Sequence, residues 1–378
     1  MTGTTPRRWM CAAAASALVA LLASAGAGRA EGLRQDEMTI PATISEAGRT
    51  TTVELEALVI RPDDAARRPL AVINHGSPRD GDKREGMSPY GLSAQAREFA
   101  RRGWAAVVFM RRGYGRSQGG WAEANGSCAD PHYAEAGRAG AREIAAVAAF
   151  MADQPYVRSG GWISVGVSAG GFATVALAAA APRGLAAAIV FAPGRGSPSP
   201  DTVCREDRLV EAFGEFGATS RIPLLWVSAE NDHFFGPRLV DRLTEAFSRS
   251  GGTLTLVRTP PFGADGHALF SAKGIPLWTP IVDRFLTTTD LAPHGPPIQA
   301  TNPDVPPPPS LNARGRQAFA DYRLRGSHKA FAIGPGTRFG WATGRRTTDQ
   351  AKSAALTYCA GGAESECAIV DVDDRAQW

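Results

Sequence analysis

The chain has 378 residues, of which 44% are apolar and 21% are charged, and its formal net charge is +4. This length allows one large domain and a smaller one, and the apolar content is ordinary for a globular protein. Because the sequence shows no basic stripe, it does not suggest a nucleic-acid partner.

The first thirty residues have the pattern of a secretory signal. Two arginines precede an uncharged stretch rich in alanine and leucine at residues 10–27, and small residues permit cleavage after Ala27 or Ala30. An uncleaved anchor is the alternative, although this stretch is barely long enough to span a bilayer. We therefore predict a signal peptide at residues 1–30. The protein would be exported, periplasmic or secreted, with no stable membrane insertion after signal removal.

Short apolar runs alternate with amphipathic segments in the rest of the chain. We predict a first antiparallel pair and then further strands; together they span residues 39–44, 51–60, 69–74, 104–110, 163–167, 186–191, 224–227 and 253–257. Helices are expected at 88–102, 134–153, 172–181, 209–213, 237–249 and 277–286. This alternation predicts an α/β fold with a mostly parallel sheet and helices on both faces. Ligands bind such sheets outside the carboxyl ends of the strands.

Residues 162–172, WISVGVSAGGF, run from a buried strand through a glycine-rich turn into an alanine-rich helix. A Gly-x-Ser-x-Gly sequence between a strand and a helix is typical of a nucleophile elbow. The sharp turn needs small residues two positions before and after the serine, and Gly166 and Gly170 occupy them. Ser168 would then project above the sheet edge at the positive end of the helix. A purely structural glycine turn is the alternative.

A serine hydroxyl needs a general base, and that base needs an orienting acid. Of the six histidines, His267 suits the base because it follows the last predicted strand of the sheet. The acid is expected after strand 224–227, where Asp232 lies deepest in the turn and Glu230 is the alternative. A solvated loop histidine and a loop-capping carboxylate are the structural alternatives.

The oxyanion that forms during acyl transfer needs two fixed N–H donors. One candidate is the backbone amide of Ala169, directly after the predicted nucleophile. The other is the amide of Ser77, which follows His75-Gly76 at the end of a predicted strand. His75-Gly76 taken alone is equally typical of an ordinary turn at a strand end.

Three loops should form the walls of the site, at residues 79–88, 118–133 and 194–208. The run from Arg111 to Ser117 has two interpretations. Its arginines either contact an anionic group of the substrate, or belong to a tight turn and form surface ion pairs.

Four cysteines remain after signal removal, and an even count in an exported protein indicates disulfides. Four cysteines allow three pairings. Closeness in sequence favours Cys359 with Cys367, and loops that should border the site favour Cys128 with Cys204. Free buried thiols are the alternative. Neither a CxxC sequence nor Cys/His spacing indicates a zinc site, and we expect no metal or organic cofactor.

Residues 293–309 contain eight prolines and predict a stiff, extended linker. Beyond it we expect a small α+β module with helices at 312–323 and 347–359 and strands at 329–333, 338–343 and 367–372. Thr347 and Gln350 form a capping-box pattern. The expected organisation is a signal peptide, a catalytic domain, a linker and a C-terminal module at residues 1–30, 37–290, 291–310 and 311–378.

Over about residues 40–290 the chain resembles the α/β-hydrolase superfamily, and in particular dienelactone-hydrolase-like and prolyl-oligopeptidase-like serine hydrolases. The motifs that carry the resemblance are Asn74-His75-Gly76-Ser77, Arg112-Gly113-Tyr114-Gly115-Arg116-Ser117, Gly166-Val167-Ser168-Ala169-Gly170-Gly171, Glu230-Asn231-Asp232 and Gly266-His267. The order Ser168, Asp232, His267 is that of α/β-hydrolases. One departure matters, because dienelactone hydrolase proper has a cysteine nucleophile where this chain has Ser168. The C-terminal module resembles small cysteine-bonded domains of exported bacterial proteins.

The expected function is hydrolysis of a small-molecule carboxylic ester through a Ser-His-Asp triad and an acyl-enzyme. A serine peptidase or amidase with the same triad is one alternative. The other is a non-catalytic envelope binding protein that keeps the fold and docks a protein or envelope partner through its C-terminal module.

Overall fold

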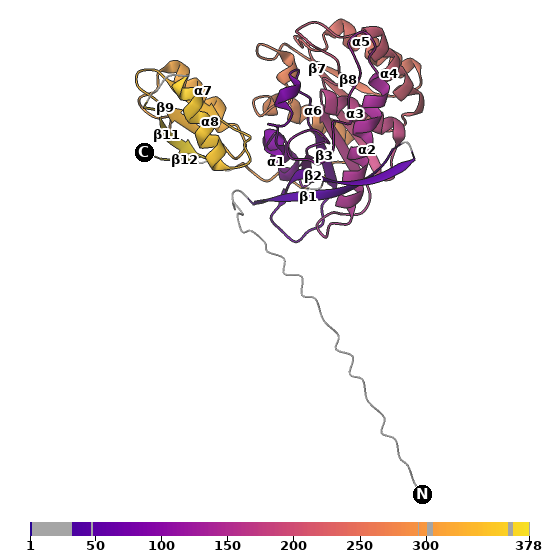
Figure 1. Cartoon of the computed structure of the whole chain (residues 1–378), viewed down its shortest axis with the longest axis horizontal. Helices are drawn as coiled ribbons and strands as arrows, with labels where there is room; N and C mark the ends of the chain where they lie inside the picture. Colours follow the sequence, from indigo (N-terminus) through magenta and orange to yellow (C-terminus); the bar gives the residue numbers. More distant parts are fainter. Residues whose placement is uncertain (2–31, 47, 294, 301–304, 362–365, 378) are drawn as a thin grey trace.

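The computed structural model of the chain has a large α/β part and a smaller C-terminal part (Figure 1). It describes residues 1, 32–46, 48–293, 295–300, 305–361 and 366–377. The predicted signal peptide, apart from Met1, lies outside the described residues, as do His294 and part of the predicted linker.

The main sheet has eight described strands in the order β1-β2-β4-β3-β5-β6-β7-β8. Their bounds are β1 Leu33–Glu46, β2 Arg49–Pro62, β3 Leu70–Asn74, β4 Ala105–Phe109, β5 Trp162–Val167, β6 Leu185–Phe191, β7 Leu224–Ala229 and β8 Thr255–Thr259. β1 pairs antiparallel with β2, from Leu33 opposite Pro62 to Glu46 opposite Arg49, and β2 is antiparallel to β4. The other neighbouring strands are parallel. The loops that follow the parallel strands therefore meet at one edge of the sheet.

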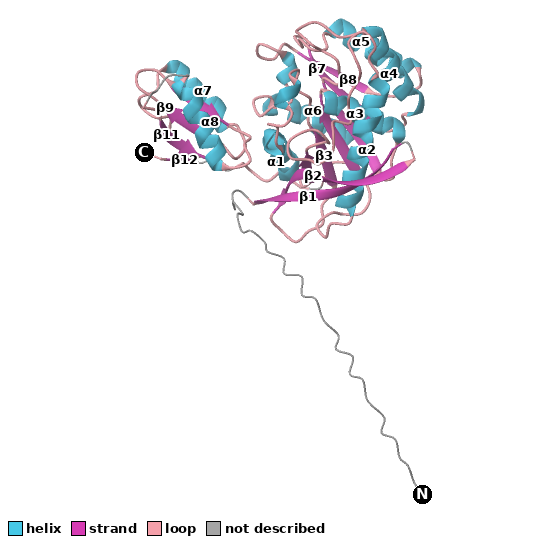
Figure 2. Ribbon diagram, in the orientation of Figure 1, coloured by secondary structure: helices cyan, strands magenta, loops and turns pink. Residues whose placement is uncertain are grey.

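Helices cover both faces of this sheet (Figure 2). Buried apolar side chains of α2, α3, α4 and α5 pack on one face, and those of α1 and α6 pack on the other. Trp226 and Trp278 are fully buried, one in each core, and burying such a side chain contributes roughly 1.5–3 kcal/mol. The bounds are α1 Ser93–Arg101, α2 Tyr133–Ala152, α3 Ala169–Ala180, α4 Glu206–Thr219, α5 Pro237–Arg249 and α6 Ile275–Thr288, with 3₁₀ turns η1 Gly81–Lys83, η2 Pro89–Leu92 and η3 Gly266–Ala268.

The predicted α/β architecture is confirmed, and three helices differ from the prediction by three residues or more at an end. α3 begins at Ala169 instead of Phe172, so that it starts directly after Ser168. α4 extends over fourteen residues instead of a short segment near Leu209. The helix expected from Ser88 begins as the 3₁₀ turn η2, with Pro89 at its first position.

The C-terminal part is a small antiparallel sheet between two helices. Its elements are α7 Ala313–Arg323, β9 Ala330–Ile333, β10 Phe339–Ala342, α8 Thr348–Ala360, β11 Ala368–Val372 and β12 Arg375–Ala376, with strand order β10-β9-β11-β12. Side chains of β9 alternate between the helices: Ala330 and Ala332 pack on α8, and Phe331 packs against aromatic residues of α7. The Thr347 side chain accepts a hydrogen bond from Gln350 N, which is half of the predicted capping box.

Polar contacts join the C-terminal part to the main sheet. Arg346 forms a two-point ion pair with Glu56, with Nε–Oε1 and Nη2–Oε2 distances of 2.6 and 2.9 Å. Ser88 Oγ donates a hydrogen bond to Gly344 O at 2.8 Å. The same Glu56 accepts a hydrogen bond from Arg116 N, so this contact reaches the turn that follows β4. Within the described ranges, no helix is both long and apolar enough to cross a membrane.

Candidate active site

Ser168 lies at a strained turn between β5 and α3. It adopts φ 54° and ψ −123°, a backbone conformation that non-glycine residues rarely adopt, and strain of this kind clusters at functional sites. A Cβ atom on Gly166 would lie 2.4 Å from Gly170 O, and one on Gly170 would lie 2.4 Å from His75 O. Both glycines of the Gly-x-Ser-x-Gly sequence are therefore required by the close approach of backbone atoms.

Asp232 and His267 are brought together from the loops that follow β7 and β8. His267 Nδ1 lies 3.2 and 3.1 Å from the two carboxylate oxygens of Asp232. The Asp232 carboxylate is buried, and its Oδ1 also accepts hydrogen bonds from the amides of Phe234 and Phe235 at 2.7 and 3.0 Å. Glu230, the alternative acid, is exposed. The geometry thus favours Asp232 as the partner of His267.

The face of the His267 ring is covered by an aromatic side chain. Phe234 stacks on it with ring centroids 3.8 Å apart, and Phe235 meets it edge-on at 5.6 Å. Phe234 and Phe235 line the same cavity as Ser168, which places the Asp232–His267 pair at the edge of that cavity. In this structure the side-chain hydrogen bonds of the described His267 ring go to Asp232, so proton transfer with Ser168 stays a prediction.

Two residues with unpaired backbone amides line the cavity together with Ser168. Ala169 N is the first amide of α3, and the first amides of a helix have no partner within it. Ser77 and Ala169 both line the cavity, and neither amide donates a hydrogen bond within the described structure. A Cβ on Gly76 would lie 3.1 Å from Ser168 Cβ, so the Ser77 loop passes close to Ser168. The role of these two amides as oxyanion-hole donors is carried into the proposal below.

His75 holds the Ser77 loop in place. Its Nε2 accepts a hydrogen bond from Arg111 N at 3.2 Å, so its Nδ1 carries the hydrogen and donates to Gly76 O at 2.6 Å. Burial, and then the nearby Arg111 charge, lower the pKa of His75 from 6.5 to about 3. His75 is therefore neutral at physiological pH and supports the loop instead of acting as a base.

A buried ionic cluster lies behind this loop and next to the cavity. Glu123 accepts hydrogen bonds from both Arg111 and Arg195. Burial alone would raise the pKa of Glu123, but the two arginines lower it to about 2. Arg112 forms a separate pair with the buried Glu143, with 2.8 Å between Nε and Oε1. Of the two interpretations of the 111–117 run, the tight turn with ion pairs fits better, although these pairs are buried instead of exposed.

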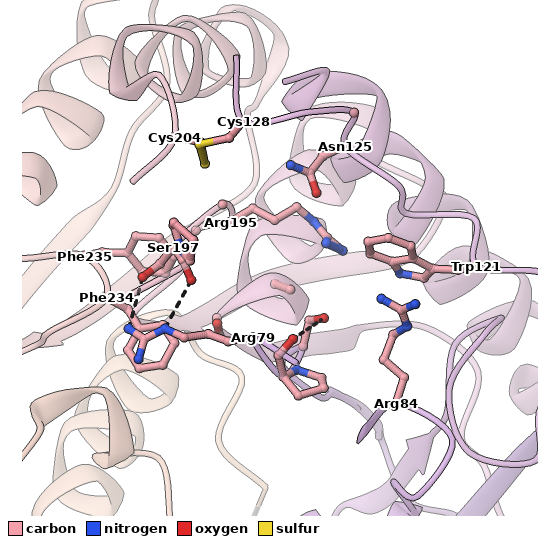
Figure 3. Close-up of a pocket in the computed structure, with 18 residues that line it drawn as sticks. Arg79, Arg84, Trp121, Asn125, Cys128, Arg195, Ser197, Cys204, Phe234 and Phe235 are labelled. Atoms are coloured by element: carbon pink, nitrogen blue, oxygen red, sulfur yellow. Dashed lines mark hydrogen bonds between the residues drawn. A yellow bond between two sulfur atoms is a disulfide. The ribbon is translucent and has the colours of Figure 1, made fainter. Parts of the chain in front are cut away.

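The cavity has a volume of about 220 Å³, and residues from all three predicted loops line it (Figure 3). The described disulfides are Cys128–Cys204 and Cys359–Cys367, which are the favoured pairs. The first lies in the cavity wall and joins the loop after β4 to the loop after β6.

The sequence analysis missed Arg79, Arg84 and Arg195, which line the cavity. Arg195 lies four residues after the carboxyl end of β6. Because ligands bind at that edge of the sheet, this position could have indicated a site residue. Of the other histidines, His233 pairs with Asp201, and His328 contacts the ring of Tyr90. In the part of the chain that the structure describes, no cluster of three or more His, Cys, Asp or Glu side chains is placed to hold a metal ion.

A family model described as X-Pro dipeptidyl-peptidase (S15 family) matches residues 51–234, a range that includes Ser168 and Asp232. The chain has the α/β-hydrolase fold, and this family match agrees with it. The strand order, the elbow and the family match support a serine hydrolase as the broad function of this α/β-hydrolase. No curated protein matches the sequence.

Solved structures similar to this α/β-hydrolase include an esterase of Pyrococcus furiosus, with 12% identity over 67% of this chain and 92% of that chain and a TM-score of 0.45. A putative dienelactone hydrolase of Klebsiella pneumoniae has 16% identity over 67% and 98%, with a TM-score of 0.42. Esterase 2 of Thermogutta terrifontis, phosphorylated by paraoxon, has 17% identity over 69% and 96%, with a TM-score of 0.47. Likenesses this remote carry no information about the substrate.

Proposed function

We propose that the protein is an exported serine esterase with Ser168, His267 and Asp232 as its catalytic triad. The observation that carries this proposal is a strained Ser168 at the elbow, together with a His267 whose Nδ1 lies 3.1 Å from a buried Asp232 carboxylate. The three residues come from loops after β5, β7 and β8, so the sheet itself sets their arrangement.

The reaction begins when Ser168 Oγ attacks the ester carbonyl carbon and His267 Nε2 accepts the hydroxyl proton. Asp232 keeps the Nδ1–H of His267 oriented and stabilises the imidazolium that forms. The amides of Ala169 and Ser77 donate to the oxyanion, a contribution worth roughly 3 kcal/mol for each donor. His267 then gives its proton to the leaving alcohol, and water releases the acid from the acyl-enzyme by the same steps.

The lining of the cavity favours an ester over the substrate of a dipeptidyl-peptidase. Such a peptidase must hold the positively charged amino terminus of its substrate near the scissile bond. Among the described residues that line the cavity there is no aspartate or glutamate, while three are arginines. Because this lining would repel an ammonium group, we favour esters over peptides with a free amino terminus as substrates. A serine amidase is the second candidate.

Export is part of the proposal. A disulfide persists in an oxidising compartment, and the two disulfides are compatible with a periplasmic or secreted protein. Sequencing the amino terminus of the mature protein would locate cleavage, which we expect after Ala27 or Ala30.

The first test is covalent labelling of the mature protein by a fluorophosphonate probe. We expect an adduct on Ser168 in the wild type, and none in Ser168→Ala or His267→Ala. Ser197→Ala is the matched control, because Ser197 lines the same cavity away from the elbow and its variant should label like the wild type. A folded wild type without an adduct would rule out the hydrolase proposal and leave the non-catalytic binding protein.

Hydrolysis of 4-nitrophenyl acetate and of the matching 4-nitroanilide then separates the two enzymatic candidates. The esterase proposal expects turnover of the ester with little or no turnover of the anilide, whereas comparable rates would favour the amidase.

A further inference from the structure

Three arginine side chains line the cavity that contains Ser168. They are Arg79, Arg84 and Arg195, and each comes from a loop that follows a strand of the sheet or an adjoining turn. No described residue of the lining carries a carboxylate. All the charged side chains of this lining are therefore positive.

Arg195 is a fixed charge in the cavity wall. It is only 5% exposed, and its Nη2 donates to Glu123, which Arg111 shares from the other side. Two guanidinium groups thus face one carboxylate, and one positive charge has no counter-charge within this cluster. The buried Nε of Arg195 has no hydrogen-bond partner. A buried charge in this state is stabilised by an additional anion.

Arg84 and Arg79 are held by aromatic faces instead of carboxylates. The Arg84 guanidinium lies over the ring of Trp121, 3.9 Å from its centroid, and no carboxylate among the described residues pairs with it. The Arg79 guanidinium lies over Phe234 at 3.5 Å and donates to Ser197 and to His233 O. Stacking positions a guanidinium without neutralising it. Figure 3 shows the ends of Arg84 and Arg195 both directed toward Trp121.

We propose that this cavity selects an ester that carries a carboxylate group, with Arg195 and Arg84 as the residues that bind that group. Guanidinium groups bind carboxylates through paired, charge-assisted hydrogen bonds, and a partly enclosed cavity strengthens them. Arg79 lies by Phe234 near His267 and adds positive charge at that side of the cavity. This inference rests on the proposed esterase function and names its substrate class.

The test compares pairs of esters in which one member carries a carboxylate and the other its methyl ester. For a carboxylate on the acyl side, the pair is the mono-4-nitrophenyl ester of adipic acid and its methyl ester. For a carboxylate on the alcohol side, the pair is 4-acetoxybenzoate and methyl 4-acetoxybenzoate. We expect a preference of about tenfold or more in kcat/KM for the anionic member of at least one pair, because hydrogen bonds to charged groups are strong. The preference should fall as salt is added. Equal or lower kcat/KM for both anionic members would overturn the proposal.

Two variants locate the selectivity. Arg84→Gln removes a half-buried charge from the cavity, and the ratio of kcat/KM between anionic and neutral esters should fall toward one. Lys83→Gln is the matched control, because it removes one positive charge from the neighbouring exposed residue, which does not line the cavity, and it should keep the wild-type ratio. An equal fall of this ratio in both variants would show that overall charge, and not the cavity, sets the preference.

Binding without turnover separates this proposal from the esterase proposal. Calorimetry of Ser168→Ala with monomethyl adipate and with 4-acetoxybenzoate should show that at least one of the two compounds binds. This binding should weaken as salt is added. It should be lost when Ser168→Ala is combined with Arg84→Gln. If no ester is hydrolysed but this binding is seen, the esterase proposal fails and the anion site stands. If esters are hydrolysed without charge preference and Ser168→Ala binds neither carboxylate, the anion site alone fails.

Discussion

The imidazole of His267 lies flat against the ring of Phe234, with 3.8 Å between the ring centroids and 14° between the planes. Asp232 holds the edge of the same imidazole, so the His267 ring is constrained at both its edge and its face. Arg79 stacks over Phe234 at 3.5 Å. The ring of Phe234, which stacks on the proposed base, therefore also positions a cavity arginine.

Replacing Phe234 by leucine removes this support while keeping an apolar side chain. We expect kcat to fall by about threefold to tenfold, since an aromatic pair contributes roughly 0.5–1.5 kcal/mol beyond its buried area. Phe234→Tyr keeps the ring and should restore kcat. Steady-state kinetics on a neutral ester measure both variants. Equal kcat values for the leucine and tyrosine variants would show that the ring does not position His267.

The elbow tolerates no side chain at Gly170. In Gly170→Ala the new Cβ would lie 2.4 Å from His75 O and 2.5 Å from Asn74 O, so β3 and α3 would have to separate. We expect a loss of roughly 3 kcal/mol in the free energy of unfolding, as for overpacked core sites, together with loss of fluorophosphonate labelling. Urea denaturation and labelling check the two effects. Gly91→Ala is the control, because a Cβ there meets no atom within 4 Å, and normal labelling of Gly170→Ala would contradict the packing argument.

The parts of this site that local pattern determines could be predicted from the sequence. The positions of Ser168, Asp232 and His267 follow from where buried strands end, and all three fall after predicted strands. α3 begins three residues before its predicted start, because tertiary packing overrides the poor helix propensity of Gly170 and Gly171. α4 was shortened for a similar reason, since Gly214 and Gly217 interrupt its apolar pattern.

The arginines of the cavity could not be predicted in the same way. Arg79 and Arg84 lie in a charged loop whose conformation depends on stacking with Phe234 and Trp121, residues that are distant in sequence. Arg111 looked like a surface residue because arginines usually are, yet it is fully buried by its pair with Glu123. Loop conformation and long-range charge pairing leave no periodic signal in the sequence.

The Cys128–Cys204 disulfide should support substrate binding as well as stability. It joins residues 76 positions apart, and both cysteines line the cavity. For Cys128→Ser with Cys204→Ser we expect a loss of about 4 kcal/mol, by the loop-entropy estimate, and a rise in KM that exceeds the change in kcat. Thermal denaturation and steady-state kinetics test this. The double serine variant of Cys359 and Cys367, which are 8 positions apart, should be destabilised by about 2.5 kcal/mol and keep the wild-type KM. A rise in KM in both double variants would contradict a specific role of the Cys128–Cys204 disulfide in substrate binding.

Acid should destabilise the protein through His75. The folded chain protonates His75 only near pH 3, whereas an unfolded histidine binds its proton near pH 6.5. Between these values the unfolded state binds more protons, so the free energy of unfolding falls as the pH falls, by up to about 1.4 kcal/mol per pH unit. Glu123 acts in the same direction at lower pH, because its stabilising contribution is present above pH 4.5 and is lost as the pH approaches 2.

Urea denaturation between pH 6.5 and 5 isolates the His75 contribution, because Glu123 titrates below that range. His75→Gln can keep one donor and one acceptor but does not titrate, so its stability should depend less steeply on pH than that of the wild type. His132→Gln removes a histidine whose side chain is 53% exposed, outside the buried network, and should keep the wild-type slope. If His75→Gln also keeps that slope, His75 does not carry the acid sensitivity.

The Arg346–Glu56 ion pair should hold the C-terminal module on the catalytic part. Both side chains are largely buried, Glu56 also accepts from Arg116 N, and Arg346 also donates to Met87 O. In Arg346→Gln a largely buried carboxylate loses its counter-charge, and breaking such a pair costs about 3–5 kcal/mol when burial is complete. Because this pair is not fully buried, we expect a smaller loss of about 2 kcal/mol and faster proteolysis between residues 289 and 312, where α6 and α7 are joined.

Limited proteolysis with mass spectrometry measures this effect. Arg314→Gln, a change on the module away from the contact, should be cut at the wild-type rate. Equal cutting of Arg346→Gln and Arg314→Gln would show that Arg346 does not secure the module.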